Sequence, residues 1–341
     1  MRHYKFGSLT RTSDLQVNPF TVHPLKRDQW ATGDYVVGKY CGVSTDNEWV
    51  ENTSGRHARI LPGDLLVGTL GVRRATLEAT GDWNAIGPDG LMEDLTHAGL
   101  FGKETSRATT AEPHPRYEYV GHVIRDGAKV CMSDFVVTPH NIPTYVCPTI
   151  MIIGTSMSSG KTTAGRVIIR LLKDMGIPNV VAAKLAGAGC YSDIMSMLDA
   201  GADAVFDFVD AGLPSSIVPA EQYKESLSVL LSMISAQSPD VVVAEVGASP
   251  FEPYNGSLAL EEMGSRAEFI VLCASDPYAA VGAKTNFGVK VDLVTGIATS
   301  TEPGAEMVEK VSGLPSLSLC TDESIKTLRK LLTKAVRPKL S

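Results

Sequence analysis

Apolar residues follow two different patterns along the chain, and the change falls near residue 148. After Pro148, short continuous apolar runs alternate with segments in which apolar residues recur every three or four positions. A continuous run is typical of a strand buried on both faces, and the three-to-four spacing is typical of a helix with one buried face. The expected strands cover residues 149–153, 179–183, 204–209, 240–246, 269–274, 291–297 and 315–319.

The helix after the first of these runs is well marked. Its apolar face at helical spacing consists of Ala164, Val167, Ile168, Leu171, Leu172 and Met175. Gly176 and Pro178 predict the end of this helix, and a last helix is expected at about 322–336. Such alternation predicts a parallel sheet with helices on both faces, so residues 148–341 are expected to form an α/β domain.

Residues 1–147 have the pattern of a mainly β domain. Segments 33–43 and 63–72 share the sequence Gly-Asp-x-x-Val-Gly, which predicts a turn followed by a short strand. The repeat fits two related hairpins of a small barrel, or two ordinary strand starts, and the second interpretation is favoured. A role in substrate binding or in oligomer contacts is expected for this domain.

Two further elements are expected in the β domain. Residues 117–137 predict a hairpin with Asp126-Gly127 at its turn. The glycine-rich segment 80–106 predicts one short helix near residues 90–97.

The overall composition narrows the class of protein. The 341 residues suggest two domains, and a net charge of −7 gives no reason to expect a nucleic-acid or membrane partner. The six cysteines are scattered without a Cys-x-x-Cys pair, which fits a reducing compartment. The N-terminus lacks a signal-peptide pattern, and no apolar run approaches the ~20 residues that span a bilayer. We therefore expect a cytoplasmic protein.

The loop before the marked helix has the composition of a phosphate-binding loop. Small residues are followed by Gly-Lys-Thr-Thr, so that backbone N–H groups can surround phosphates. Lys161 would reach the β- and γ-phosphates, and the Thr162 hydroxyl would bind Mg²⁺. The alternative is an ordinary strand–turn–helix. The expected nucleotide-binding residues are Gly154, Thr155, Ser156, Met157, Ser158, Ser159, Gly160, Lys161, Thr162 and Thr163.

The position of the first glycine points to a family. Gly154 lies one residue earlier than in G-x-x-x-x-G-K-[ST], and a loop that begins Gly-Thr resembles that of dethiobiotin synthetases and cobyrinate amidotransferases. "AAKLAGAGCYSD" and "VVVAEVGASP" resemble other segments of that branch. "SMLDAGADAVFDFVDAGLPSS" resembles a two-domain group that includes D-glutamate N-acetyltransferases. The resemblance covers about residues 148–320, and the N-terminal half departs from that group.

The resemblance implies further site residues and an assembly. It implies a lysine near substrate after the second strand and an acidic metal partner at Asp193, which alternatively caps a helix. It also implies a homodimer or higher homo-oligomer, because relatives often build sites across a dimer interface. Residues 274–277 and 295–301, which follow later strands, are weaker candidates for lining the nucleotide site.

Charged residues at strand ends suggest the chemistry. Glu245 ends the run Val-Val-Val-Ala, where a buried carboxylate needs a partner, so we expect it to assist Mg²⁺; the alternative is a cap of the next loop. Lys184 follows Val-Val-Ala-Ala at the same edge. Together with Lys161 it is expected to act in catalysis by neutralising a transferring phosphoryl group or a substrate carboxylate; the alternative is a surface lysine.

Three residues are candidates for contact with substrate. Asp210 lies near the end of the third strand, His97 lies in a glycine-rich loop, and Arg73 follows a strand and could bind a carboxylate. For each of them a structural role is the alternative.

The favoured function is an ATP- and Mg²⁺-dependent enzyme, a ligase, synthetase or kinase-like protein, that activates a small carboxylate-bearing metabolite by phosphoryl transfer. One alternative is an N-acyltransferase that acts on an amino acid and uses acyl-CoA. Another is a nucleotide-switched binding or metal-delivery protein.

Overall fold

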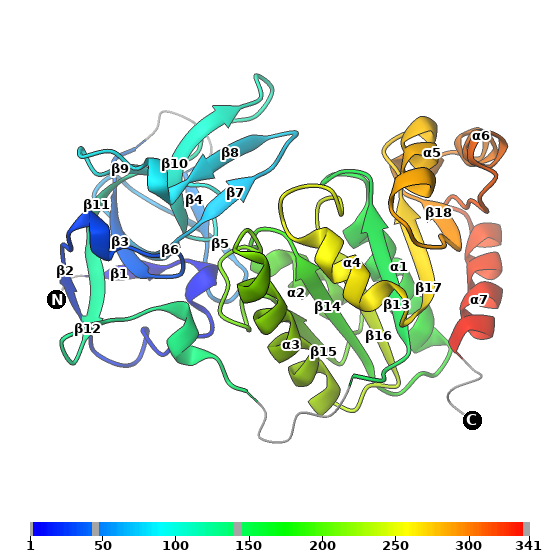
Figure 1. The fold of residues 1–341 in the computed structure, drawn as a ribbon, viewed down its shortest axis with the longest axis horizontal. Coiled ribbons are helices and arrows are strands. Elements are labelled where there is room, and N and C mark those ends of the chain that lie inside the picture. The colour runs from blue at the N-terminus through cyan, green and yellow to red at the C-terminus, as the bar shows by residue number, and fades with distance from the viewer. Residues whose placement is uncertain (1–2, 43–47, 139–144, 337–341) are drawn as a thin grey trace. The chain divides into compact units, whose positions relative to one another are not determined.

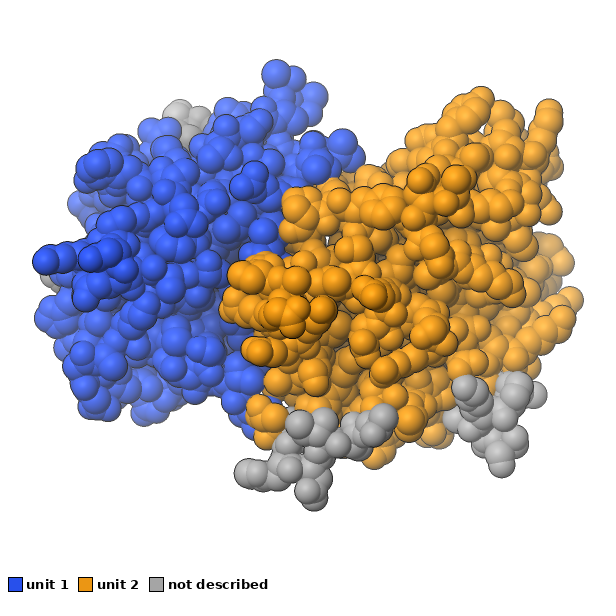
Figure 2. Space-filling view, viewed as in Figure 1, with its two compact units in different colours: residues 1–137, 188–192, 208–217 blue, residues 138–187, 193–207, 218–341 orange. Residues whose placement is uncertain are grey.

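The structure, a computed structural model, describes residues 3–42, 48–138 and 145–336. The chain divides into two compact units, shown in different colours in Figure 2. Unit 1 comprises residues 1–137, 188–192 and 208–217, and unit 2 comprises residues 138–187, 193–207 and 218–341. Two short segments from the later half of the chain therefore belong to the unit that the N-terminal residues build.

Hydrogen bonds explain why these two segments group with the N-terminal residues. The buried carboxylate of Glu51 accepts hydrogen bonds from the backbone N–H groups of Tyr191 and Ser192, each at 2.7 Å. In the second segment, the Ser215 hydroxyl donates to the carbonyl of Val72 at 2.7 Å. The sequence analysis placed both segments in the C-terminal domain because strand and helix patterns continue on either side of them.

Unit 1 is built mainly of short strands. One ten-stranded sheet has the order β1-β6-β3-β11-β9-β10-β8-β7, with β2 and β12 paired to β11, and β4 pairs with β5 separately. The strands are β1 Tyr4–Phe6, β2 Thr21–His23, β3 Tyr35–Tyr40, β4 Trp49–Glu51, β5 His57–Arg59, β6 Leu65–Leu70, β7 Val72–Arg74, β8 Ala79–Asp82, β9 Leu91–Asp94, β10 Leu100–Arg107, β11 Arg116–Arg125 and β12 Ala128–Lys129. Short 3-10 helices are η1 Ser8–Thr10, η2 Arg27–Gln29, η3 Trp83–Ala85 and η4 Met132–Phe135.

Five of these strands form a closed ring. β6 pairs with β3 on one side and with β10 on the other, and β3, β11, β9 and β10 complete the circuit. Each strand of the ring therefore has a neighbour on both sides, which removes open sheet edges from this part of the unit. The core cluster includes Tyr40, Met92, Phe101 and Tyr117, all at most 1% exposed. The five strands make a small barrel.

The Gly-Asp-x-x-Val-Gly repeat forms two adjacent strands of this barrel. β3 and β6 pair antiparallel, with Val37 of one copy opposite Val67 of the other. The preceding turns match as well, because Gly33 and Gly63 have φ values of 88° and 94°. In each copy the aspartate carboxylate accepts a hydrogen bond from the backbone N–H three residues earlier, at 2.8 and 2.9 Å. The favoured interpretation, two strand starts, therefore describes each copy, because neither strand pairs with the next one in a hairpin, while the barrel of the alternative interpretation is present.

Other sequence-based expectations for single elements had mixed outcomes. The hairpin is confirmed at its turn, where β11 and the two-residue β12 flank Asp126 and Gly127 at positive φ, whereas residues 132–135 of its expected second strand form η4. The helix expected near 90–97 is wrong, because residues 91–94 form β9, and pairing with β10 and β11 overrides a weak local pattern.

The strand expected at 315–319 is wrong as well. Ser316 makes an isolated parallel bridge to Val294, and Pro315 has no N–H to donate to a ladder.

The sheet of unit 2 is parallel throughout and has the order β15-β14-β16-β13-β17-β18. Apart from the 315–319 segment, the expected apolar runs form its strands. They are β13 Thr149–Gly154, β14 Val180–Ala186, β15 Ala204–Asp207, β16 Val241–Val246, β17 Ala267–Cys273 and β18 Leu293–Thr295. The helices are α1 Lys161–Asp174, α2 Tyr191–Asp199, α3 Ala220–Ala236, α4 Gly256–Gly264, α5 Pro277–Asn286, η5 Ile297–Thr299, α6 Glu302–Ser312 and α7 Asp322–Val336.

Helices cover both faces of this sheet, as the sequence predicts (Figure 1). On one face, Ile168 of α1 and Leu328 and Leu332 of α7 pack in a core cluster with strand residues such as Ile150 and Val243. On the other face, α3 and α4 contact β14, and α4 also contacts β16 and β17. The packing of helices on both faces holds the carboxyl ends of the strands in one row.

Among the described residues, every helix is too short or too polar to span a bilayer.

Replacement of Gly68 by alanine is expected to destabilise the barrel. A Cβ at this position would lie 2.3 Å from the carbonyl oxygen of Gly99, next to the β6–β10 pairing that closes the ring. Overpacking of this kind costs about 1–3 kcal/mol, so the urea midpoint should fall. Gly282→Ala in α5 is the control, because no heavy atom lies within 4 Å of its Cβ position and alanine favours a helix. An equal fall in both variants would contradict the closed ring.

Candidate phosphate-binding site

The segment expected to bind phosphate lies between a buried strand and a helix N-terminus. β13 ends at Gly154 and α1 begins at Lys161. Gly160 has a φ of 99°, a left-handed conformation that glycine adopts without strain. Within the loop the Ser159 hydroxyl donates to the carbonyl of Ser156 at 2.9 Å. This is the strand–loop–helix arrangement of a phosphate-binding loop.

Lys161 is buried against the loop that precedes it. Its Nζ donates to the carbonyls of Ser156 and Met157 at 2.7 and 3.2 Å. Burial lowers the pKa of Lys161, and the nearby carboxylate of Glu245 opposes that shift. Phosphate oxygens are stronger acceptors than neutral carbonyls, so the ammonium can exchange its present partners for an anion in the loop.

The early glycine of the motif has a steric explanation. A Cβ at Gly154 would lie 2.5 Å from Ser159 Oγ and 2.8 and 2.9 Å from Cδ and Nζ of Lys161. The missing side chain therefore makes room for the lysine. The next residue, Thr155, donates from its hydroxyl to Ser275 Oγ at 3.2 Å, which ties the loop to the end of β17.

The other loop residues occupy different environments. Met157 is half-buried, whereas Ser158 and Thr163 are exposed. Ile297 donates its backbone N–H to the carbonyl of Ser159 at 3.2 Å, so the segment that follows β18 lies against the loop. A Cβ at Gly296 would lie 2.2 Å from that same carbonyl oxygen.

Glu245 lies beside the loop on the neighbouring strand. β16 pairs with β13, and Glu245 is opposite Ile152. The Thr162 hydroxyl donates to Glu245 Oε2 at 3.3 Å, so the two residues lie together, and their metal role stays a prediction. Burial raises the pKa of Glu245, and the positive charges of Lys184 and Lys161 act in the opposite direction.

Lys184 and Asp193 form an ion pair at the same edge. Lys184 is opposite Glu245 in the β14–β16 register, and its buried ammonium binds the Asp193 carboxylate. The surface-lysine alternative for Lys184 is therefore excluded. α2 begins at Tyr191, so Asp193 lies in its first turn rather than at its N-cap.

These residues form a compact set of compensating charges. The ammonium groups of Lys161 and Lys184 and the carboxylate of Glu245 are buried, Asp193 is partly exposed, and the other three groups all shift the pKa of Glu245. Thr162 and Glu245 offer the hard oxygen donors that Mg²⁺ prefers, and Mg²⁺ commonly takes one or two protein oxygens, with waters and phosphate oxygens as its other ligands. The residues present fit a magnesium ion held mainly by nucleotide phosphates. No cluster of three or more His, Cys, Asp or Glu residues suited to a metal occurs among the described residues.

Two glycines that sequence reasoning missed make room for Lys184. A Cβ at Gly187 would lie 2.9 Å from Lys184 Cε, and a Cβ at Gly247 would lie 3.0 Å from the same atom. A Cβ at Gly247 would also lie 2.1 Å from the carbonyl oxygen of Ala186. The available signal was a glycine directly after each of two neighbouring buried strands.

The substrate candidates all belong to unit 1, and each has a partner there. Arg73 pairs with Glu78 and donates to the carbonyl of Leu95 at 2.8 Å. Asp210 pairs with Arg11 at 3.1 Å. These contacts provide a structural role for both residues, and substrate contact stays a prediction.

His97 is the most unusual of the three candidates. It has a φ of 60°, which is uncommon for a residue other than glycine. Its ring stacks on Trp49 with centroids 4.1 Å apart, and its Nδ1 contacts the Trp49 carbonyl at 3.2 Å. Burial lowers the pKa of His97 to about 4, so the ring is neutral at pH 7. A strained, neutral imidazole is compatible with function.

The turn that carries His97 is held by Asp94. The buried Asp94 carboxylate accepts hydrogen bonds from the backbone N–H groups of Thr96, Gly99 and Leu100 at 3.1–3.3 Å. Burial raises the pKa of Asp94 to about 7 despite these donors. The pKa of Asp94 is therefore raised and the pKa of His97 is lowered, so that in the folded turn the carboxyl group has the higher of the two values.

Alanine at residue 154 is expected to weaken nucleotide binding at least about tenfold, because it displaces the ammonium of Lys161 and the charge-assisted contacts are lost. Titration with a fluorescent nucleotide measures the change. Gly165→Ala in α1 is the control, because its Cβ would make ordinary contacts of 3.4 Å or more. Unaltered binding by Gly154→Ala would contradict the steric explanation.

The pH dependence of the free energy of unfolding should reveal the opposite pKa shifts of Asp94 and His97. The raised pKa of Asp94 contributes stability below about pH 4 that is lost as the pH rises to about 7. The lowered pKa of His97 contributes stability above about pH 6.5 that is lost as the pH falls to about 4. Between pH 4 and pH 6.5 the two slopes oppose each other.

Single variants should therefore separate the two pH dependences when the free energy of unfolding is measured by urea titration at several pH values. Asp94→Asn should become less stable than the parent protein as the pH falls from about 6.5 to 4. His97→Asn, which tolerates positive φ, should become less stable as the pH rises from about 4 to 7. Each difference should approach at most about 1.4 kcal/mol per pH unit. Parallel profiles for all three proteins would contradict the assignment.

Comparison with known proteins gives weak likenesses. No protein-family model matches the chain, and no curated protein matches it. Chloroplast FtsY from Physcomitrella patens is 14% identical over 61% of this chain and 71% of its own, with a TM-score of 0.37. The hydrogenase maturation factor HypB from Archaeoglobus fulgidus is 14% identical over 57% and 92%, with a TM-score of 0.36. A DUF1611-family protein from Anabaena variabilis is 18% identical over 60% and 63%, with a TM-score of 0.35, so this chain spans less than two thirds of that protein.

TM-scores this low support no assignment of activity, nucleotide or partner. The resemblance to the dethiobiotin synthetase branch, drawn from the sequence, stays a prediction. What the structure shows is an α/β unit with a phosphate-binding loop arrangement, together with a mainly β unit.

Proposed function

We propose that the protein is an ATP- and Mg²⁺-dependent enzyme that activates a carboxylate of a small metabolite by phosphoryl transfer. The observation that carries the proposal is the cluster of Lys161, Lys184 and Glu245 at one edge of the unit 2 sheet, beside a loop shaped for phosphate. Two buried ammonium groups near a helix N-terminus are suited to the negative charge of a transferring phosphoryl group.

Each residue of the cluster has a distinct role in this proposal. Lys161 leaves the loop carbonyls and binds the β- and γ-phosphates. Lys184 lies across from Glu245 and neutralises the phosphoryl group or the substrate carboxylate. Thr162 and Glu245 hold the magnesium ion, which when bound offsets the charge of the phosphate oxygens.

The reaction follows from this charge arrangement. A substrate carboxylate oxygen attacks the γ-phosphorus, the bond to the ADP oxygen breaks, and an acyl phosphate and ADP form. An amine or similar nucleophile then displaces phosphate from the acyl group. Most of the catalysis is positioning and charge neutralisation.

The proposal also includes a homodimer or higher homo-oligomer. Light scattering on the full chain measures this oligomeric state.

Variants at the cluster should affect different steps. Lys161→Ala should weaken Mg·ATP binding by about 100-fold, which corresponds to about 2.7 kcal/mol. Glu245→Gln should keep metal-free nucleotide binding and lose the gain that Mg²⁺ provides. Isothermal titration with and without Mg²⁺ measures both, and Lys326→Ala, from an exposed ion pair with Glu323, is the control. If Lys161→Ala binds and turns over as the parent protein does, the proposal fails.

Product analysis separates the proposal from its main alternative. Hydroxylamine traps an acyl phosphate as a hydroxamate, so ADP and hydroxamate should form together when ATP and a panel of small carboxylic acids are supplied. Acyl transfer from acetyl-CoA to an amino acid without release of ADP would support the acyltransferase alternative. Parallel assays with GTP decide which nucleotide the loop uses.

A further inference from the structure

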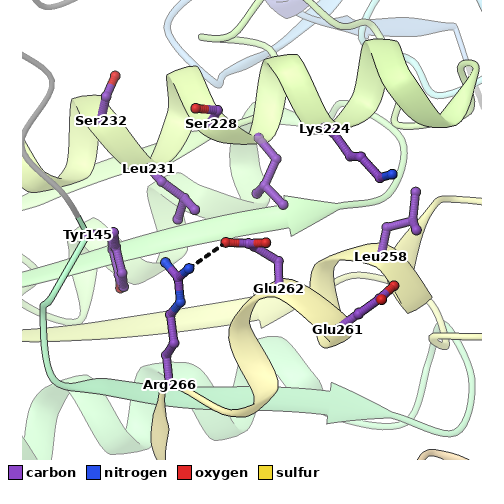
Figure 3. A pocket seen from close by; sticks show the side chains of 10 residues that line it. Tyr145, Lys224, Ser228, Leu231, Ser232, Leu258, Glu261, Glu262 and Arg266 are labelled. Atoms are coloured by element: carbon purple, nitrogen blue, oxygen red, sulfur yellow. Dashed lines mark ion pairs between the residues drawn. The ribbon is translucent and has the colours of Figure 1, made fainter.

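A cavity of about 570 Å³ lies between α3 and α4 in unit 2 (Figure 3). It is situated near the amino ends of the sheet strands, because Tyr145 precedes β13 and Arg266 directly precedes β17. The phosphate loop follows the carboxyl end of β13. A strand of this length spans roughly 20 Å, so the cavity is separate from the cluster around Lys161.

The cavity has an apolar wall. Leu227 and Leu231 of α3, Leu258 of α4 and the ring of Tyr145 line it. The Tyr145 hydroxyl is engaged with Thr149 Oγ1 at 2.6 Å, so the side chain offers its ring rather than its hydroxyl. The cavity volume falls within the range of small-molecule sites, about 300–1,000 Å³.

One pair of opposite charges projects into this space. Arg266 Nη2 and Glu262 Oε1 are 2.9 Å apart, and Figure 3 shows both side chains directed between the helices. The two side chains are 44% and 46% exposed. An exposed pair of this kind contributes only about 0–1 kcal/mol, so its opening costs little. Glu261 and Lys224 also line the cavity, and Lys224 pairs with Glu221 at 3.2 Å.

We propose that this cavity binds a small α-amino acid with an apolar side chain. Its carboxylate binds Arg266, its ammonium binds Glu262, and its side chain lies against Leu227, Leu231 and Leu258. An α-amino acid carries adjacent opposite charges. Its binding therefore replaces the ion pair between Arg266 and Glu262 with two ion pairs between the protein and the ligand. The apolar wall provides the additional burial that favours binding.

The charges also exclude other classes of small molecule. A dicarboxylate would place one negative charge near Glu261 and Glu262. A neutral hydrocarbon would form no ion pair with Arg266 or Glu262, so these two charges would not favour its binding.

Isothermal titration with L-leucine tests the proposal on the full chain. We expect saturable binding with a Kd of about 1 mM or tighter. Leucinamide and N-acetyl-leucine each lack one of the two charges and should bind at least about tenfold more weakly, which corresponds to about 1.4 kcal/mol. Failure of leucine to bind, or equal binding of all three compounds, would overturn the proposal.

Variants locate the binding site. Arg266→Gln and Glu262→Gln should each reduce leucine binding at least tenfold. Lys326→Gln is the control, because Lys326 and Glu323 form an exposed ion pair on α7, away from the cavity lining. Lys161→Ala should bind leucine as the parent protein does, which separates this site from the phosphate loop. Unchanged affinity in Arg266→Gln would overturn the proposal even if leucine binds.

Discussion

The burial of the Glu245 carboxylate is the constraint on which the carboxyl edge of the unit 2 sheet depends. A carboxylate at the end of an apolar strand is costly unless opposite charge lies close to it. Lys184 and Lys161 supply that charge from the neighbouring strand and from the loop. The lysines in turn need room, which the glycines at 154, 187 and 247 provide. Small residues and buried charges at this edge are therefore parts of one arrangement.

The constraint in unit 1 is the pairing of backbone groups at the edges of its sheet. A strand at the edge of an open sheet leaves a row of backbone N–H and C=O groups unpaired. The β6–β10 pairing closes the ring, and the aromatic core fills it. The turn that carries His97 runs directly into β10, so an unusual backbone conformation is followed at once by a strand of the closed ring.

Sequence reasoning recovered what depends on neighbouring residues. The strands of unit 2, the helix after the loop and the hairpin at Asp126-Gly127 all follow from local patterns. Closure of the barrel depends on pairing between distant segments, and no local pattern encodes it. The partner of Asp210 was hidden for the same reason, because Arg11 is far from Asp210 in the sequence. At the candidate site, the loop was predictable, whereas the Lys184–Asp193 ion pair was not.

The repeated motif of the barrel has an evolutionary consequence. Gly38 and Gly68 occupy the same position in the two copies, but their surroundings differ. A Cβ at Gly38 would lie 2.8 Å from the end of the Met92 side chain and 3.0 Å from Phe101 Cζ and Tyr117 Cβ, whereas one at Gly68 would lie 2.3 Å from the backbone carbonyl oxygen of Gly99. If the copies arose by duplication, they no longer accept the same substitutions. A larger residue at the first glycine would need coordinated changes in the side chains of the barrel core, whereas at the second it would need the backbone of a neighbouring strand to move.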